Sequence, residues 1–155
     1  TDGGGEWGAY DDQWVYLHED HSDPTSSYSH SNGRWAKRHM KLGETIYNSE
    51  NELTSYDSEC RVIRKFRFPF TNRLDRYLPN VYISPDLGRR DVIVIMSTPE
   101  PWEVYQDFEL IYYAKGAGPV MWQEWQYWKL KHESRFTHFG GSKVIPARLP
   151  CNPPR

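Results

Sequence analysis

The chain has 155 residues and a mass of 18.4 kDa, a length that suits one domain better than two independent cores. Apolar residues make up only 37% and mean hydropathy is -0.84, yet aromatic residues reach 15%, with 7 Trp and 11 Tyr. We therefore expect a small core built on large rings. The longest uncharged apolar run is Val92–Met96, far short of the roughly 20 residues of a membrane-spanning helix, so no transmembrane segment is expected.

The net charge of -2 conceals an uneven distribution of charge along the chain. Residues 1–60 carry 12 acidic and 4 basic side chains, whereas residues 61–90 carry 8 basic and 2 acidic ones. Such an asymmetry suits either internal pairing of opposite charges or contacts with two different partners. The near-neutral total is not typical of a nucleic-acid-binding domain, which is usually basic throughout.

The chain holds two cysteines, Cys60 and Cys151, and no CxxC motif. A zinc ribbon, an iron–sulfur site and a thioredoxin-type motif therefore have no support. We expect two free thiols, because a framework built on disulfides would contain more cysteines; one disulfide closing a long loop is the alternative. The first residue is Thr1 rather than Met, which favours a processed mature chain or a fragment.

In chain order, the expected elements are mostly strands joined by irregular segments. A glycine-rich arm over residues 1–11 precedes a strand in which polar and apolar residues alternate, and residues 19–33 form a long polar loop. Further strands are expected at residues 60–68, 81–84, 91–97 and 104–114. The five consecutive apolar residues Val92–Met96 predict a strand buried on both faces.

The one expected helix spans Val120–His132. Met121, Trp125 and Trp128 lie at positions i, i+4 and i+7, and Pro119 suits a first helical turn. A proline-rich arm over residues 140–155 follows. The fold class expected is therefore α+β: a small antiparallel β-sheet, one Trp-rich C-terminal helix, and long irregular N- and C-terminal arms. All of this forms a single domain over residues 1–155, with its core at residues 12–139.

Four histidines in or near the polar loop are a candidate zinc site. Two of them form a His-x-x-His pair with acidic neighbours that are able to orient metal ligands. The spacing does not match the helical HExxH motif, so solvated loop histidines are the simpler interpretation and no cofactor is assigned. The candidate ligands are His18, His21, His30 and His39.

A basic, aromatic strip begins at Arg61, where cations alternate with phenylalanines. Cations on one strand face and rings on the other would suit phosphate contact and base stacking, so RNA and anionic lipid head groups are possible partners over residues 61–90. The simpler interpretation is that the cations face acidic residues of this chain or of a partner protein. The cations assigned to partner contact are Arg61, Arg64, Lys65, Arg67, Arg73 and Arg76.

Aromatic and aliphatic residues outside the expected core are candidates for a protein interface, where such residues are enriched. Trp125 and Trp128 face inward on the expected helix, which leaves Trp122 and Tyr127 lateral. Four more apolar residues lie in the two arms and would lie across a partner. They are Trp7, Tyr10, Ile145 and Leu149.

No catalytic signature is present. Asp107 and Glu109 share a strand face and would form an acid/base pair only by the chance spacing that any half-exposed strand offers. The sequence contains no G-x-S-x-G motif and no phosphate-binding loop. We therefore expect no enzymatic activity.

The function we expect is that of a non-catalytic accessory or structural subunit of a larger multiprotein assembly. An organellar respiratory or ribosomal complex is the first choice, with import into the mitochondrion favoured over secretion. The first alternative is a secreted β-rich carbohydrate-binding module with exposed Trp and Tyr and a Cys60–Cys151 disulfide. The second is a small zinc-dependent hydrolase built on the His18–His39 loop.

Overall fold

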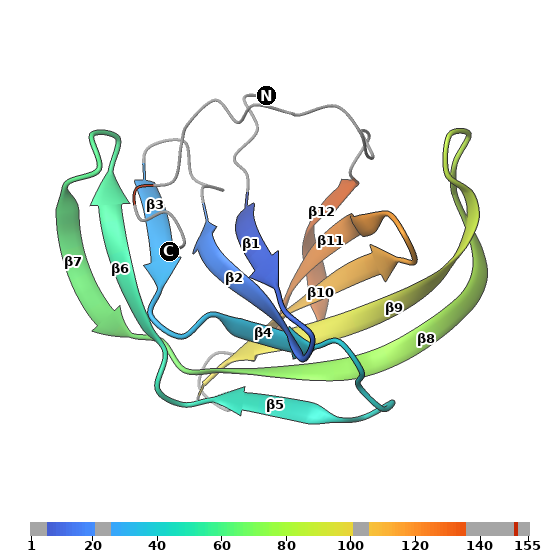
Figure 1. Cartoon of the computed structure of the whole chain (residues 1–155), viewed down its shortest axis with the longest axis horizontal. Coiled ribbons are helices and arrows are strands. Elements are labelled where there is room, and N and C mark those ends of the chain that lie inside the picture. Colours follow the sequence, from blue (N-terminus) through green and yellow to red (C-terminus); the bar gives the residue numbers. More distant parts are fainter. Residues whose placement is uncertain (1–5, 21–25, 101–105, 136–150, 152–155) are drawn as a thin grey trace. The chain divides into compact units, whose positions relative to one another are not determined.

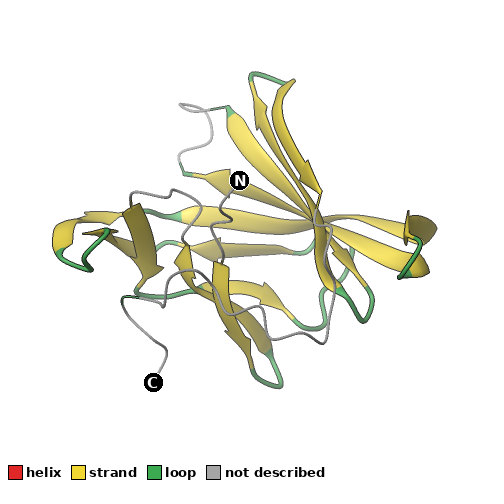
Figure 2. Cartoon of the chain, turned by 90° about the horizontal axis from the view of Figure 1, so that it is seen from above, coloured by secondary structure: helices red, strands yellow, loops and turns green. Residues whose placement is uncertain are grey.

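The computed structural model describes residues 6–20, 26–100, 106–135 and 151, and every element in them is a β-strand (Figure 2). The described residues form twelve strands, and each recorded strand pairing is antiparallel. The α+β prediction is therefore wrong: over its described part the chain is all-β. No helix there is long and apolar enough to cross a membrane.

The chain divides into two compact units. The first contains residues 1–39, 48–69 and 143–155, and the second contains residues 40–47 and 70–142. Each unit is organised around one sheet of six strands. The single domain over residues 1–155 with a core at 12–139 remains a prediction.

The sheet of the first unit has the strand order β1-β2-β3-β6-β7, and β4 also pairs with β2 (Figure 1). One edge of β2 pairs along its length with β1, while its other edge is shared between β4 and β3. The strands are β1 (Glu6–Tyr10), β2 (Trp14–Asp20), β3 (Ser26–His30), β4 (Arg34–Lys37), β6 (Glu52–Asp57) and β7 (Val62–Arg67). The expected loop at residues 19–33 thus includes the end of β2 and all of β3.

The expected N-terminal arm contains a strand because a tight turn folds it back onto β2. The Asp11 carboxylate accepts hydrogen bonds from the backbone N–H groups of Gln13 and Trp14, each at 2.7 Å, and from the Tyr16 hydroxyl at 2.6 Å. The hydrogen bond from Tyr16, with those from Gln13 and Trp14, holds the pKa of Asp11 below its usual value. An aspartate that binds its own following backbone is a typical turn former.

The interior of the first unit is unusually polar. Among its described side chains the buried apolar ones are Ala36, Leu53 and Tyr56. The buried polar ones are more numerous: Glu19, Ser27, Ser29, Asn48, Asn51 and Ser55. Buried polar groups need hydrogen-bond partners and contribute little hydrophobic stabilisation, so this unit requires another source of stability.

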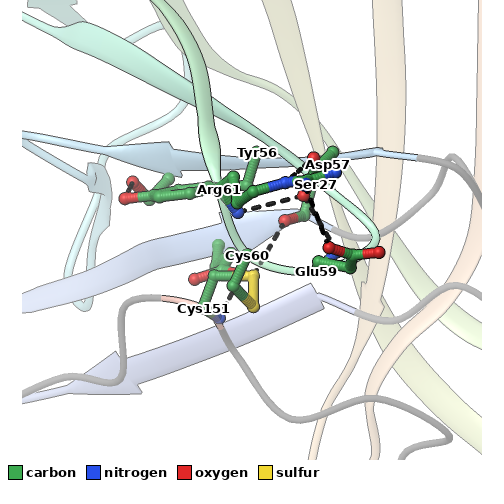
Figure 3. Close-up of a disulfide and its surroundings, with 9 residues drawn as sticks. Ser27, Tyr56, Asp57, Glu59, Cys60, Arg61 and Cys151 are labelled. Carbon is green, nitrogen blue, oxygen red and sulfur yellow. Dashed lines mark hydrogen bonds and ion pairs between the residues drawn. A yellow bond between two sulfur atoms is a disulfide. The ribbon is translucent and has the colours of Figure 1, made fainter.

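A disulfide between Cys60 and Cys151 supplies a covalent link in the first unit (Figure 3). Cys60 lies in the turn between β6 and β7, its Cα is 5.2 Å from that of Cys151, and the two are 91 residues apart in sequence. The Cys151 N–H donates to the fully buried carboxylate of Glu19 at 2.7 Å. The prediction of two free thiols is therefore wrong: cysteine number alone does not report that two distant residues meet.

The β6–β7 turn that carries Cys60 is fixed by Asp57. The Asp57 carboxylate accepts the backbone N–H groups of Glu59 at 2.9 Å and Arg61 at 3.0 Å, and its other oxygen accepts the Arg61 guanidinium at 2.8 Å (Figure 3). These bonds, first of all that from the Arg61 backbone, hold the pKa of Asp57 below its usual value. The turn is thus tied by hydrogen bonds and by the disulfide.

The sheet of the second unit has the order β12-β11-β10-β9-β8-β5 (Figure 1). Its longest strands, β8 and β9, form a hairpin between β10 and the edge strand β5, and the expected extended piece at residues 81–84 is the end of β8. The strands are β5 (Thr45–Asn48), β8 (Phe70–Ser84), β9 (Gly88–Pro99), β10 (Asp107–Ala114), β11 (Gly118–Gln126) and β12 (Lys129–Arg135).

Apolar side chains are buried on both faces of β9 and β10 in the second unit. One face holds Val92 and Val94 together with Phe108, Leu110 and Ala114. On the opposite face Ile95, Ile111 and Leu74 of β8 are in register and buried, but Ile93 is 38% exposed. The strand expected over residues 91–97 therefore exists, while its predicted burial on both faces fails at Ile93.

The predicted helix Val120–His132 is instead the β11–β12 hairpin. Its pattern was ambiguous, because Met121 and Trp125 are four residues apart and therefore also share one face of a strand. Trp is favoured in strands, and β11 gains a full ladder of hydrogen bonds with β10. Moreover, the turn of this hairpin contains no Gly, Asn or Pro that would have signalled it.

Candidate functional site

The β11–β12 turn presents two aromatic side chains in a strained backbone conformation. Gln126 pairs with Lys129, so Tyr127 and Trp128 alone form the turn. Their φ angles are +48° and +62°, the left-handed geometry that two-residue hairpins usually fill with Asn-Gly. This conformation costs roughly 1–2 kcal/mol for a residue with a Cβ. Nevertheless, Tyr127 is 61% and Trp128 is 66% exposed.

A buried phenylalanine supports the exposed turn from below. The Phe108 ring is 6% exposed and stacks on Trp125 with their centroids 5.8 Å apart, while Trp128 contacts Phe108 at 5.4 Å with a tilt of 58°. Register places Phe108, Trp125 and Leu130 in one row across three strands, and Leu130 is 46% exposed. We call Phe108, Trp125, Tyr127, Trp128 and Leu130 the aromatic tip.

A hydrogen-bond network fixes the orientation of Trp125. The side-chain oxygen of buried Gln123 accepts from the Trp125 indole N–H and from the Tyr112 hydroxyl, each at 3.2 Å. The Gln123 amide donates to Glu133 at 2.8 Å, and Arg135 donates to the other oxygen of Glu133 at 3.0 Å. The hydrogen bonds from Gln123 and then Arg135 hold the pKa of Glu133 below its usual value.

We expect Gln123→Met to lower the free energy of unfolding by about 2 kcal/mol, because it leaves the partly buried Tyr112 and Trp125 donors without their acceptor. Urea denaturation followed by tryptophan fluorescence measures the change. Gln126→Met is the matched control, because the Gln126 amide makes a single long bond of 3.5 Å to Asp107. A loss below 1 kcal/mol in Gln123→Met would show that the network does not hold Trp125 in place.

The structure does not bring the four candidate histidines together over its described part. The His18 ring stacks on Tyr16 in β2, with centroids 6.0 Å apart, whereas His39 is exposed after β4. His21 lies outside the described residues. Within the described residues, no group of three or more His, Cys, Asp and Glu side chains is arranged to hold a metal ion.

His30 belongs to a polar cluster in the first unit. The Asn51 amide donates to His30 Nδ1 at 3.1 Å and to the carbonyl of Phe68 at 3.0 Å, and Asn51 is fully buried. Burial lowers the pKa of His30 to about 4, against the opposing effect of the Asp20 carboxylate. This cluster keeps the imidazole neutral. It joins β3 to Asn51, just before β6, and to Phe68, just after β7.

The cations of the basic strip belong to two different units. Arg61, Arg64, Lys65 and Arg67 lie on or next to β7 in the first unit. Arg73 and Arg76 lie on β8 in the second unit, and both pair with Asp75, at 2.6 and 2.9 Å. The predicted strip is therefore not one strand, and three of its cations, Arg61, Arg73 and Arg76, already have a carboxylate partner.

The other expected contact residues are scattered. Trp122 is half-buried on β11, in register with buried Ile111 on β10. Trp7 and Tyr10 belong to β1, while Ile145 and Leu149 lie outside the described residues. Asp107 and Glu109 lie on β10 as expected, but the Asp107 carboxylate contacts Gln126 rather than a second acid.

Of the aromatic tip, only Tyr127 was predicted as a contact residue from sequence. The sequence predicts that Trp125 and Trp128 face inward on a helix, where the structure has the β11–β12 hairpin, and it indicates no contact role for Phe108 or Leu130. The signal that identifies the tip is structural, namely two bulky residues at positive φ. Comparisons of the chain with protein-family models, curated proteins and solved structures found no match.

Proposed function

We propose that this chain is a non-catalytic binding protein, an accessory component of a larger protein assembly, and that it contacts its partner through the aromatic tip. The supporting observation is the combination of strain and exposure at Tyr127 and Trp128. A turn selected for folding alone would favour small residues at these positions. Bulky rings held there at a cost in stability are a typical sign of a functional site.

The chemistry of the aromatic tip suits a protein partner. Trp and Tyr provide large contact areas with few rotatable bonds, and they are the residues most enriched among those that dominate binding energy. Trp128 rests on the buried Phe108, so its ring is already positioned before binding. Such preorganisation reduces the entropy lost on association.

The disulfide bears on where this binding takes place. Disulfides persist in secreted proteins and in oxidising lumens, and they are rare in reducing compartments. Because the polar first unit relies on Cys60–Cys151, an assembly outside the cell or in an oxidising lumen fits the chain better than one in the mitochondrial matrix. Secretion therefore replaces the mitochondrion as the favoured location within this proposal.

A carbohydrate-binding module is the second candidate, and the Cys60–Cys151 disulfide favours it because that alternative required this bond. Sugar rings pack their C–H groups against the electron-rich faces of aromatic rings. A sugar chain, however, binds best to several exposed rings, whereas Tyr127 and Trp128 are the only two well-exposed rings of the tip. The protein partner therefore remains the first choice.

We expect Tyr127→Asn to raise the free energy of unfolding by about 1 kcal/mol, because asparagine adopts the left-handed conformation readily and the exposed tyrosine buries little surface. Chemical denaturation measures the change. Tyr82→Asn is the matched control, since Tyr82 is equally exposed but lies within β8. If Tyr127→Asn instead loses as much stability as the control, the backbone at position 127 is not strained, and the proposal loses its supporting observation.

The proposed function is tested by placing a photo-crosslinking amino acid at position 128 and, as a control, at position 82. In extracts of the source we expect a discrete crosslinked protein from position 128 only, and migration of the unmodified chain within a complex on native gels. The double variant Tyr127→Asn/Trp128→Gly should remain folded and lose the complex. Migration of the wild-type chain at 18 kDa, with binding on a glycan array that the double variant loses, would instead support the carbohydrate module.

A further inference from the structure

Strand β7 lies at the end of the first unit's sheet and is exposed along most of its length. It pairs with β6, and no other described strand pairs with it. Five of its six residues are exposed, and the apolar side chains of Val62 and Ile63 are 56% and 58% exposed. The outer edge of such a strand offers backbone N–H and C=O groups to a further strand.

Two of the three cations on β7 have no acid opposite them on β6, whereas the third, Arg67, lies opposite Glu52. Register places Arg64 opposite Ser55 and Lys65 opposite Thr54 on β6, so neither faces an acid across the strand. The Arg64 guanidinium lies over the Phe66 ring, 4.6 Å from its centroid, which holds it in an extended position while it keeps its charge. The strand itself contains no acidic residue.

The strand is held at both ends before any partner arrives. At its start, the Asp57 N–H donates to the Arg61 carbonyl at 3.0 Å, next to the disulfide at Cys60. At its end, the Phe68 N–H donates to the carbonyl of Asn51 at 2.9 Å. A strand fixed in this way loses little conformational entropy when another strand adds to it.

We propose that β7 binds an extended acidic peptide segment of a partner protein by β-strand addition. The peptide's backbone would continue the sheet, its carboxylates would face Arg64 and Lys65, and its apolar side chains would cover Val62 and Ile63. This surface goes beyond the aromatic tip, because it lies on a different strand and selects a different chemistry.

A second copy of this chain fits the edge less well. Antiparallel pairing of two β7 strands about their centre would place Arg64 of each copy opposite Lys65 of the other. Like charges directly opposite each other destabilise a strand pair. Strand β12, at one end of the second unit's sheet, is also exposed, but it contains an acid of its own: Glu133 lies 3.0 Å from Arg135, and His132 lies 3.9 Å from Glu124. Because β7 carries three cations and no acid, its charge favours an acidic occupant.

The experiment is a titration of the intact, disulfide-bonded chain with a short peptide in which two adjacent glutamates are followed by two adjacent valines, so that carboxylates and apolar side chains reach both faces of the added strand. Binding is followed by NMR of backbone amides. We expect shifts at β7 and at the facing residues of β6. Replacing every glutamate by glutamine, or changing the chain to Arg64→Glu/Lys65→Glu, should weaken binding about tenfold, a loss of about 1.4 kcal/mol spread over the charge pairs. The Arg64→Glu/Lys65→Glu variant should keep the wild-type circular dichroism spectrum, because both positions are exposed.

Two controls separate strand addition from simple charge attraction. Lys129→Glu/Lys131→Glu on β12 should leave the affinity unchanged, and a peptide with alternate N-methylated amides should not bind, because it cannot complete the ladder. Equal binding of the methylated peptide, no binding of the glutamate peptide, or tighter binding of an oligonucleotide to β7 would each overturn the proposal. None of these outcomes alters the crosslinking result expected at position 128.

Discussion

Cys60→Ser is expected to lower the free energy of unfolding by about 4 kcal/mol, the largest effect predicted for a single change in this chain. The disulfide closes a segment of 91 residues, and a loop of this length removes a large conformational entropy from the unfolded chain. The first unit has few buried apolar side chains among those described, so little else offsets the loss. Cys151→Ser should have the same effect.

Urea denaturation of both single variants and of the double variant checks this prediction. Because the two cysteines act as one bond, the double variant should be no less stable than either single variant. Cys151→Ser also tests whether the bond from the Cys151 N–H to Glu19 survives without the disulfide. A loss below 1 kcal/mol in all three variants would show that the polar interior of the first unit is held by its hydrogen bonds instead.

Several strands of the fold were predictable because their signal is local. The alternation at residues 60–68 and the apolar run at 91–97 fall within or around β7 and β9, and the strand expected at 104–114 is largely β10. In each case the side chains that face the same way repeat every second residue, and a proline or a polar segment marks an end. The length of a strand was less predictable, since β9 extends beyond residues 91–97. Burial on both faces was also less predictable, because Ile93 is 38% exposed.

Elements whose signal depends on distant pairing were missed. Strand β3 is made of Ser, Tyr and His, a composition typical of a loop, and it is a strand because β6 and β2 pair with it on both sides. The β11–β12 hairpin was read as a helix because Tyr127 and Trp128 occupy a turn that normally contains asparagine and glycine. A local rule failed there, which is what is expected where a residue serves binding rather than folding.

The sequence predicted that exposed aromatic residues would form the candidate site, but it did not predict which ones. An excess of rings over aliphatic residues indicated that some aromatics would be exposed, and Tyr127 was among those expected. Which rings lie together depends on the register of β10, β11 and β12, which places Phe108, Trp125 and Leu130 in one row. Periodicity along one segment carries no information about that register.

Acidification from pH 7 to pH 4 should lower the free energy of unfolding by up to about 3 kcal/mol through His30. In the folded chain burial lowers the pKa of His30 from 6.5 to about 4. The stabilisation from the neutral imidazole is therefore complete above pH 6.5, and it is lost progressively as the pH falls from 6.5 toward 4. The carboxylates with lowered pKa values, such as Asp11 and Asp57, lose their contribution only at lower pH.

The geometry around His30 explains why its proton is excluded. The Asn51 amide directs one hydrogen to the Phe68 carbonyl and the other to His30 Nδ1, so Nδ1 must act as an acceptor. Protonation of Nδ1 would set two donors against each other inside a buried site. The charged groups that also act on His30 oppose each other, since Asp20 favours the imidazolium and His18 disfavours it. Burial therefore decides the direction.

His30→Gln removes the titration while leaving a side-chain oxygen that is able to accept from Asn51. We expect this variant to be somewhat less stable at pH 7 and to lose most of the slope of stability against pH between 6.5 and 4.5. Urea denaturation at a series of pH values, with the exposed His39→Gln as the matched control, measures that slope. If His30→Gln keeps the wild-type slope, the proton taken up on acid unfolding binds elsewhere, and the Asn51 cluster does not hold His30 neutral.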